Sequence, residues 1–418
     1  MKKLGLFLCM MALILSSCSE DDDVITPQCT IPFNLSETDI TSNAATLQWD
    51  DSNDTGSFSI EYGVSGFAQG TGTIVNSSEA MLALSGLTAN TTYDYYVQTT
   101  CDATSISLWS DVKSFTTLPN PVIPQLLTNL SELNLFNGDL ADLTPSIYAF
   151  EYKLSTPLFS DYAHKQRIMA LPIGTTLEYE DDGLPIFPEG TLIAKTFFYN
   201  NDERDLSLGR QIIETRVLIL RDGNWETGDY KWNAEQTDAV LDFDGSTVPI
   251  TWIDADGDTN NISYEIPSNT DCFTCHQTFD AVTPIGPKLR TLNFDIDGVN
   301  QLQDFIDANY ISGLASSETV SSLPNWEDDS FTLEERARAY FDIQCAHCHI
   351  DGGFCQFQSP LRLSYETAFN DSFIFQQRFS IEFRVSNYEE GLSMPFIGTT
   401  ILHDEGVELM LEYIDSLE

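Results

Sequence analysis

Two short segments of this chain combine two cysteines and a histidine at the same spacing. The first is Cys272-Phe273-Thr274-Cys275-His276 and the second is Cys345-Ala346-His347-Cys348-His349. Two thiols three positions apart can each add to a vinyl group of one porphyrin, and the adjacent imidazole can then bind its iron. With 9 Cys and 5 His in 418 residues, such a match is expected by chance in roughly two chains in a thousand. We therefore expect covalently attached haem at both segments.

Zinc is the alternative cofactor for the same cysteines, since Cys-x-x-Cys pairs also bind that metal. A zinc pair does not require a histidine directly after it, whereas both pairs here are followed by one, His276 and His349. In a haem site each of these imidazoles is an axial ligand of the iron. The sequence thus favours two covalently bound c-type haems, and a shared zinc site stays open.

The residues around the second motif are arranged as helix, motif, loop and helix. A helix is expected from Thr332, because Glu335 three positions later completes a capping box. A last helix is expected over residues 404–417, where apolar residues share one face. Between the two, Met394 precedes Pro395. This layout resembles that of small cytochromes c, in which the first and last helices pack together over the haem edge and a Met-Pro loop supplies the sixth ligand.

Met394 is therefore the expected sixth ligand of the second haem iron. The alternative is a core methionine, since Met fills gaps in apolar cores well. His403 is a rival ligand by residue type, although a histidine directly before a helix is more often a surface or cap residue.

The N-terminus has the pattern of a targeting segment. Lys2 and Lys3 precede an apolar run over residues 4–15, which is short for a transmembrane helix. The segment Leu15-Ser16-Ser17-Cys18 resembles a bacterial lipobox, which implies that residues 1–18 hold a lipoprotein signal peptide and that Cys18 carries lipid. The acidic run at the start of residues 19–28 resembles a surface-export signal of some Gram-negative lipoproteins, and the alternative is a solvated tether. The resemblance implies an outer-membrane lipoprotein that is exposed at the cell surface.

The charge balance limits the partners of the chain. Lys and Arg number 19 against 64 Asp and Glu, which gives a formal net charge of −45. A chain this acidic repels nucleic acid and anionic membrane surfaces, so we expect no nucleic-acid partner and membrane contact only through the lipid. Because 42% of the residues are hydrophobic, the charge does not indicate disorder.

Residues 29–118 have the pattern of a β-sandwich, in which short alternating runs are separated by turn-rich pieces. Strands are expected at residues 45–49 and 58–62. The segment at residues 87–97 resembles the tyrosine-corner segment of fibronectin type III domains, and residues 109–117 resemble their last strand. The implied domain is a spacer or a binding arm, because function does not follow from this fold.

The 9 cysteines can be assigned by elimination. Cys9 leaves with the signal peptide, Cys18 carries lipid and four cysteines take haem. Of the other three, Cys29 and Cys101 bracket the sandwich and are expected to form a disulfide, which an oxidising compartment permits. Cys355 is left over, either buried and inert or near the second haem.

A proline-rich linker is expected at residues 119–127, where prolines forbid helix. Residues 128–325 form the expected β-rich domain with the first motif, and residues 326–418 form the α-helical, cytochrome c-like domain with the second. Within the β-rich part a short helical stretch is expected among residues 125–143. The strands are expected at residues 176–179, 192–199 and 211–220.

A broader resemblance extends from about residue 130 to the end of the chain. It is to a bacterial family of two-haem c-type proteins whose activity is largely unassigned. The piece between the second motif and Met394 is shorter and poorer in glycine here than in the family pattern and contains Cys355, so contacts made by that piece are not carried over. The segments that carry the resemblance are residues 156–163, 187–191, 214–216, 300–302, 336–340 and 403–407.

A second, weaker similarity concerns the β-rich part that ends at the first motif. The segment at residues 188–195 ahead of it looks like part of the small β-fold cytochromes that oxidise hydroxylamine. The resemblance implies that His276 is the only protein ligand of the first iron, with an open far side, and the rival ligands there are His164 and Met169. Lys195 is a candidate for the wall of that pocket, or else a strand lysine with a solvated head.

An acidic run at residues 254–258 resembles the start of a calcium loop. Asp254, Asp256, Asp258 and Glu265 match positions of an EF-hand, but Thr259 stands where the sharp turn requires glycine. We expect an acidic turn rather than a Ca²⁺ site.

Together these patterns predict an anchored dihaem protein that either transfers electrons or performs small-molecule redox chemistry. The alternative is a surface-binding lipoprotein whose sandwich binds glycan or protein and whose haem or metal sites are structural.

Overall fold

The structure is a computed structural model that describes residues 29–53, 56–389 and 391–417. Cys18, the signal peptide and the acidic tether lie outside these residues. The chain divides into two compact units at Asn120 and Pro121. None of the described helices is long and apolar enough to cross a bilayer.

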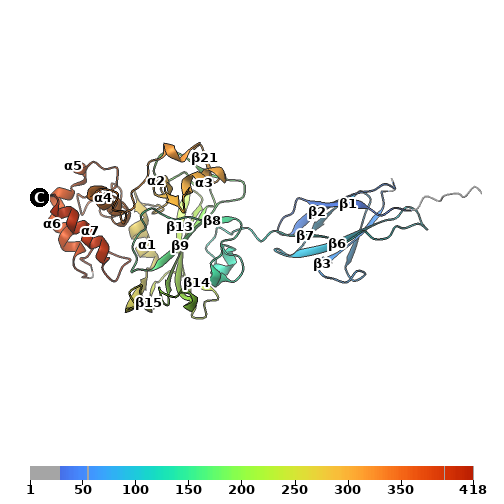
Figure 1. The fold of residues 1–418 in the computed structure, drawn as a ribbon, viewed down its shortest axis with the longest axis horizontal. Coiled ribbons are helices and arrows are strands. Elements are labelled where there is room, and N and C mark those ends of the chain that lie inside the picture. The colour runs from blue at the N-terminus through green and yellow to red at the C-terminus, as the bar shows by residue number, and fades with distance from the viewer. Residues whose placement is uncertain (1–28, 54–55, 390, 418) are drawn as a thin grey trace, which may run out of the picture. The chain divides into compact units, whose positions relative to one another are not determined.

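The first unit is a sandwich of two antiparallel sheets (Figure 1). Large side chains from both sheets, including Trp49, Tyr95 and Phe115, fill the space between them. The Tyr93 hydroxyl accepts a hydrogen bond from the Thr88 backbone N–H at 2.9 Å, which is the contact that defines a tyrosine corner. One sheet has the order β1 (Phe33–Thr38), β2 (Ala44–Asp50), β5 (Met81–Ser85), and the other β4 (Thr73–Ser77), β3 (Phe58–Val64), β6 (Thr92–Thr99), β7 (Lys113–Thr116).

A disulfide joins Cys29 and Cys101 in this unit, as the cysteine assignment predicts. It fixes the segment before β1 to the segment after β6. The sandwich prediction is confirmed together with its strands.

The second unit is built on a six-stranded antiparallel sheet. Long runs of β-branched and aromatic residues form its central strands, as expected for a sheet that is covered on both faces. The strand order is β14 (Ala239–Asp242), β13 (Asn224–Trp232), β12 (Arg210–Arg221), β11 (Leu192–Asn200), β9 (His164–Ala170), β8 (Ala149–Glu151).

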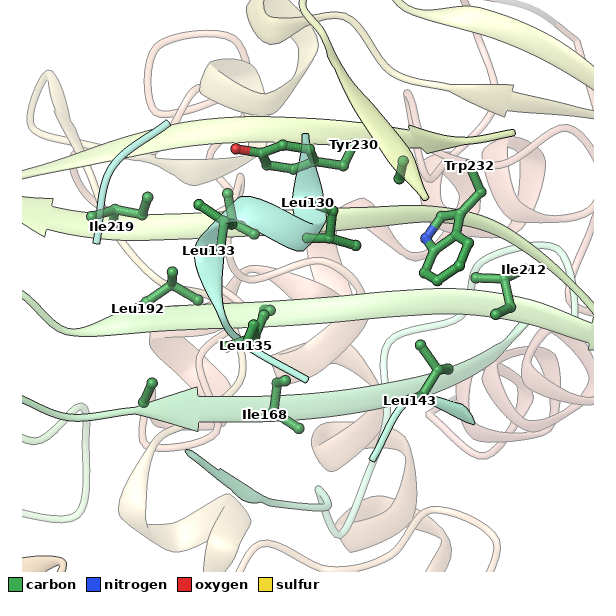
Figure 2. Packing of buried hydrophobic residues seen from close by; sticks show 14 residues of the cluster. Leu130, Leu133, Leu135, Leu143, Ile168, Leu192, Ile212, Ile219, Tyr230 and Trp232 are labelled. Atoms are coloured by element: carbon green, nitrogen blue, oxygen red, sulfur yellow. The ribbon is translucent and has the colours of Figure 1, made fainter. Parts of the chain in front are cut away.

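One face of this sheet is covered by the chain that precedes it. Two short 3₁₀ helices, η1 (Leu130–Leu133) and η2 (Leu140–Asp142), supply leucines to that face. Figure 2 shows Leu130 and Leu133 above the strands that carry Leu192, Ile219 and Tyr230. The helical stretch expected among residues 125–143 is thus present, in 3₁₀ form.

The opposite face carries two separate apolar clusters. One packs Met169 and Ile193 against α2 (Leu289–Leu292) and α3 (Gln301–Asp307). The other packs Phe197 against the hairpin of β15 (Ser246–Ile253) and β16 (Thr259–Ile266).

Short elements connect these parts. They are β10 (Leu177–Glu178) paired with β21 (Ile311–Ser312), β17 (Gln277–Thr278) with β18 (Ala281–Val282), β19 (Asp295–Ile296) with β20 (Val299–Asn300), and the 3₁₀ helices η3 (Leu206–Leu208) and η4 (Ser317–Thr319). The acidic run is the loop of the β15–β16 hairpin, and the Asp254 carboxylate accepts the N–H groups of Asp256 and Asp258. Strands flank this run, whereas an EF-hand requires helices.

The C-terminal part is helical. The helices are α4 (Leu333–Gln344), α5 (Phe369–Ser372), α6 (Ile374–Val385) and α7 (Asp404–Asp415). Thr332 and Glu335 form the predicted capping box of α4. Helix α4 packs against α7, as the cytochrome-like layout predicts, and α6 also packs against α7. Helix α6 has no counterpart in the sequence prediction.

The segment at residues 156–161 joins the helical part to the sheet. The Gln344 side chain donates to the Pro157 carbonyl and accepts from the Phe159 N–H, both at 2.9 Å. The Asp161 carboxylate accepts from the N–H and hydroxyl of Thr400 at 2.9 and 2.7 Å. These contacts place the end of α4, and therefore the second motif, beside the sheet.

Candidate functional site

Helix α1 (Asn269–His276) carries the first motif. It begins directly after β16, where Ser268 and Asp271 form a capping box, and it packs against β13. A capped eight-residue helix fixes Cys272, Cys275 and His276 on a rigid element.

The His276 imidazole has the hydrogen bond that an iron ligand needs. Its Nδ1 lies 2.9 Å from the Thr283 carbonyl, and because a carbonyl only accepts, Nδ1 carries the proton. Nε2 is then the lone-pair nitrogen that is available to a metal. Burial lowers the pKa of His276 to about 3, so the imidazole is neutral at physiological pH.

The second motif opens onto a cavity of about 450 Å³. This volume lies within the range of roughly 300–1,000 Å³ that is usual for cofactor sites. Cys345, Cys348, His349 and Met394 all line it, together with residues of α4 and α6. The structure therefore brings together all four second-site residues that the sequence predicts.

Two buried polar atoms at this cavity have no partner among the described residues, namely Nδ1 of His349 and Nδ1 of His347. A buried polar group without a partner is unfavourable, so both imidazoles are expected to contact a further polar group when the cavity is filled. The donor set of two thiols, an imidazole and a thioether is the one that holds a c-type haem. Donors and volume both fit that group at the second motif.

The first motif faces a smaller cavity of about 70 Å³, lined by Cys272, Cys275, His276, Lys195 and Arg216, among others. This space suits a few water molecules rather than a macrocycle. Cys275 also lines the larger cavity. At the first motif the donor set therefore fits haem, but the 70 Å³ cavity does not hold one by itself. The space for a macrocycle is available only if the larger cavity is counted as well.

The two motifs converge. The ligand atoms of Cys275, His347 and Cys348 all lie within 4.8 Å of one another. Because Cys348 hydrogen-bonds to it, the pKa of Cys275 lies well below its ordinary value, and that of Cys348 is raised. His347 lines both cavities. The sequence did not indicate this role, since His347 occupies a variable position of the motif.

Cys355 lies beside the same group. It lines the larger cavity, and its backbone N–H donates to the Cys348 carbonyl at 3.1 Å. The sequence leaves Cys355 either buried and inert or near the second haem site, and the structure places it near the second motif. A hydrogen bond from Cys348 lowers the pKa of Cys355 to about 7.

A row of cations crosses the sheet beside the first motif. Arg167 of β9, Lys195 of β11 and Arg216 of β12 are direct cross-strand partners, so they lie on one face. Arg216 is paired with Glu214 at 2.5 Å and lies 3.7 Å from Asp229. Lys195 is half-buried, and burial together with the two arginines lowers its pKa to about 7. Lys195 thus lines the pocket rather than extending into solvent.

The structure brings neither rival ligand to the first motif. His164 is exposed and pairs with Glu203 at 2.7 Å, and Met169 is buried against α2 and α3. His403 stacks on Phe159 with ring centroids 4.2 Å apart, and its Nδ1 lies 2.8 Å from the Tyr340 hydroxyl. It therefore contributes to packing.

Comparisons with known proteins concern the sandwich. The model of the fibronectin type III domain matches residues 30–114, so the first unit is fibronectin type III-like. No curated protein matches the chain.

Three solved structures illustrate the similarity. A computationally redesigned β-sandwich protein is 25% identical, with a TM-score of 0.19, and the match covers 21% of this chain and 95% of that one. The fibronectin type III domain of human contactin 1 is 19% identical, with a TM-score of 0.21 and coverage of 23% and 82%. The FN5 domain of Drosophila Lar is 15% identical, with a TM-score of 0.19 and coverage of 22% and 98%.

Proposed function

We propose that this chain is an anchored two-haem c-type redox protein, which either transfers electrons or acts on a small molecule. The proposal rests on one observation: two Cys-x-x-Cys-His motifs converge in the second unit, and the larger of their cavities has Met394 on its wall. A bound haem supplies reversible one-electron chemistry at its iron.

The chain's own residues have distinct roles in this proposal. His276 and His349 would each bind the iron of one haem, and Thr283 fixes the tautomer of His276. Met394, on the wall of the larger cavity, would supply the second protein ligand at the second site. Because His164 and Met169 lie elsewhere, neither would fill the far side of the first site, which would leave it to a small molecule or to His347. The second site is then the electron-transfer centre.

The test is the haem content and spectrum of protein matured in a periplasm that attaches haem. Pyridine haemochrome analysis is expected to give two haems per chain, and EPR one low-spin and one high-spin component. Carbon monoxide is expected to shift only the high-spin component. Two low-spin haems would remove the open site, and a chain with no covalent haem would refute the proposal.

A zinc site is the second candidate, because the ligand atoms of Cys275, His347 and Cys348 lie within 4.8 Å of one another. Two sulfurs and an imidazole nitrogen are ligands that zinc prefers. Thioether formation at either cysteine removes its thiolate, so haem and zinc at this point exclude each other. Metal counting on the same preparation separates the two: two irons support haem, and one zinc without iron supports the second candidate.

The anchor and the sandwich complete the proposal. Cys18 would carry the lipid of an outer-membrane, surface-exposed lipoprotein, and the sandwich would hold the redox unit away from the membrane. The competing function is a surface-binding lipoprotein in which the sandwich binds glycan or protein. Deleting residues 29–118 distinguishes them, because reduction and reoxidation of the haems should survive the deletion if the sandwich is a spacer. Labelling with palmitate, compared in a Cys18→Ala variant, tests the anchor.

A further inference from the structure

The cationic row beside the first motif is unusual for this chain. Only 19 of the 418 residues are Lys or Arg, yet Arg167, Lys195 and Arg216 are neighbours on one sheet face. Like charges directly opposite each other on adjacent strands are destabilising. The row therefore requires either fixed countercharges or a bound anion.

Fixed carboxylates account for one member of the row. Glu214 pairs with Arg216 in a two-pronged contact, with Oε2 2.9 Å from Nε and Oε1 2.5 Å from Nη2. Asp229 is the next carboxylate along, and it too faces Arg216. Among the described residues, Lys195 and Arg167 have neither an ion pair nor a side-chain hydrogen bond.

The position of Lys195 shows where the anion would lie. Its Nζ is 5.2 Å from the centre of the Phe197 ring, and its side chain lines the 70 Å³ cavity with Cys272, Cys275 and His276. Arg216 lines the same cavity. Thus one cation with a carboxylate partner and one without face the same small cavity, next to the predicted iron ligand.

We propose that Lys195, supported by Arg216, binds an anionic oxygen group in the first-motif cavity. The ligand class is a carboxylate or a small inorganic oxyanion, which is either a propionate of the haem itself or a free substrate. This inference rests on the proposed function, since it names the class of group that the open first site takes. A free oxyanion in this position would be the substrate of that site.

Lys165 provides a matched control. It lies on the same sheet face and its Nζ is 5.8 Å from the same Phe197 ring, but it is not part of the cavity wall. Its ammonium instead donates to the Ala163 carbonyl at 2.9 Å. A Lys165→Gln variant therefore makes the same side-chain change in the same region without altering the cavity wall.

The experiment compares the wild type with Lys195→Gln, Lys195→Arg and Lys165→Gln. Haem is first counted in each protein. The oxidised holoproteins are then titrated with sodium nitrite while the Soret band is recorded, and the reduction potentials of both haems are measured without nitrite.

If the ligand is a free oxyanion, nitrite should change the Soret band of the wild type in a saturable way. The affinity for nitrite should then be at least tenfold weaker in Lys195→Gln. Lys195→Arg should keep most of the affinity and Lys165→Gln all of it. A haem propionate predicts no nitrite response, and a lower potential for one haem in Lys195→Gln only, because a cation near the ring favours the reduced state. The inference is overturned if Lys195→Gln behaves like Lys165→Gln in both measurements.

If the wild type contains no haem, the proposed function fails but the anion site is still testable. Nitrite should then raise the unfolding temperature of the wild type and of Lys165→Gln more than that of Lys195→Gln. Equal shifts in all the proteins would refute the anion site.

Discussion

The sulfur atoms of Cys275 and Cys348 lie within 4.8 Å of each other, although one belongs to α1 and the other follows α4. In c-type attachment each sulfur is bonded to the edge of its porphyrin. The two attachment points of the proposed haems are therefore adjacent, and we expect electronic coupling between the two sites.

The coupling is testable with two variants that each keep one site, Cys272→Ala/Cys275→Ala and Cys345→Ala/Cys348→Ala. Circular dichroism in the Soret region of the wild type should contain a split feature that is absent from an equimolar mixture of the variants. The mixture holds the same number of haems, so it is the control. Identical spectra would show that the sites are independent.

Both motifs are recognisable in the sequence, whereas their convergence is not, and the reason is physical. The contact depends on tertiary hydrogen bonds such as those from Gln344 to the segment at residues 157–159. No local pattern encodes that docking. The same holds for His347, because any residue type can occupy its position in the motif. Its contact with Cys275 arises only because α1 lies close to the second motif.

Helix α6 is not recognisable from the sequence, for a different reason. Its outer face carries Phe375, Phe379 and Phe383, which are 41%, 60% and 55% exposed. A helix is recognised by a polar face opposite an apolar one, and these phenylalanines remove that contrast. The sandwich, by contrast, is predictable because buried residues such as Leu47 and Trp49 alternate with less buried, polar neighbours along β2.

Replacing Met394 tests the second site. We expect Met394→Ala to convert one haem to a high-spin form that binds carbon monoxide, because the sixth ligand is lost. The stability loss should be no more than about 2 kcal/mol, since the side chain is only partly buried. Optical and EPR spectra measure the first effect and denaturant unfolding the second.

Met410→Leu is the control for Met394→Ala. Met410 is 4% exposed in the core of the same helical part, and a Met-to-Leu change conserves volume. Its spectra should equal those of the wild type. If Met394→Ala also leaves the spectra unchanged, Met394 is a packing residue and not a ligand.

His403 should make the second unit less stable in acid. Burial lowers its pKa from the ordinary value of 6.5, so below pH 6.5 the unfolded chain binds a proton that the folded chain does not. Its contribution to stability is therefore present above pH 6.5 and is lost as the pH falls. The slope from one group is at most about 1.4 kcal/mol per pH unit.

We expect His403→Gln to flatten the curve of unfolding free energy against pH between about pH 6.5 and pH 5. Denaturant unfolding across this range measures it. A curve for His403→Gln parallel to that of the wild type would contradict the prediction.

Gly406 permits the close approach of α7 and α4. A Cβ at this position would collide with the Tyr340 hydroxyl and lie 2.7 Å from His403 Nδ1. We expect Gly406→Ala to destabilise the second unit by about 1–3 kcal/mol through overpacking. The control is Glu408→Ala, at an exposed position of the same helix. Alanine by itself favours the helix over glycine by about 1 kcal/mol. A rise in the melting temperature of Gly406→Ala would therefore show that α7 and α4 can move apart without a loss of packing energy.

The disulfide between Cys29 and Cys101 should account for much of the stability of the sandwich. It closes a loop with a sequence separation of 72, for which loss of chain entropy in the unfolded state predicts a contribution of about 4 kcal/mol. Calorimetry of the full chain should show a lower first-unit transition in Cys29→Ser/Cys101→Ser and an unchanged second-unit transition. Cys355→Ser, which removes a cysteine of the second unit, should leave the first-unit transition in place. If the double variant melts like the wild type, the strain of the bridge offsets its entropic effect, and the core around Trp49 and Tyr95 holds the sandwich by itself.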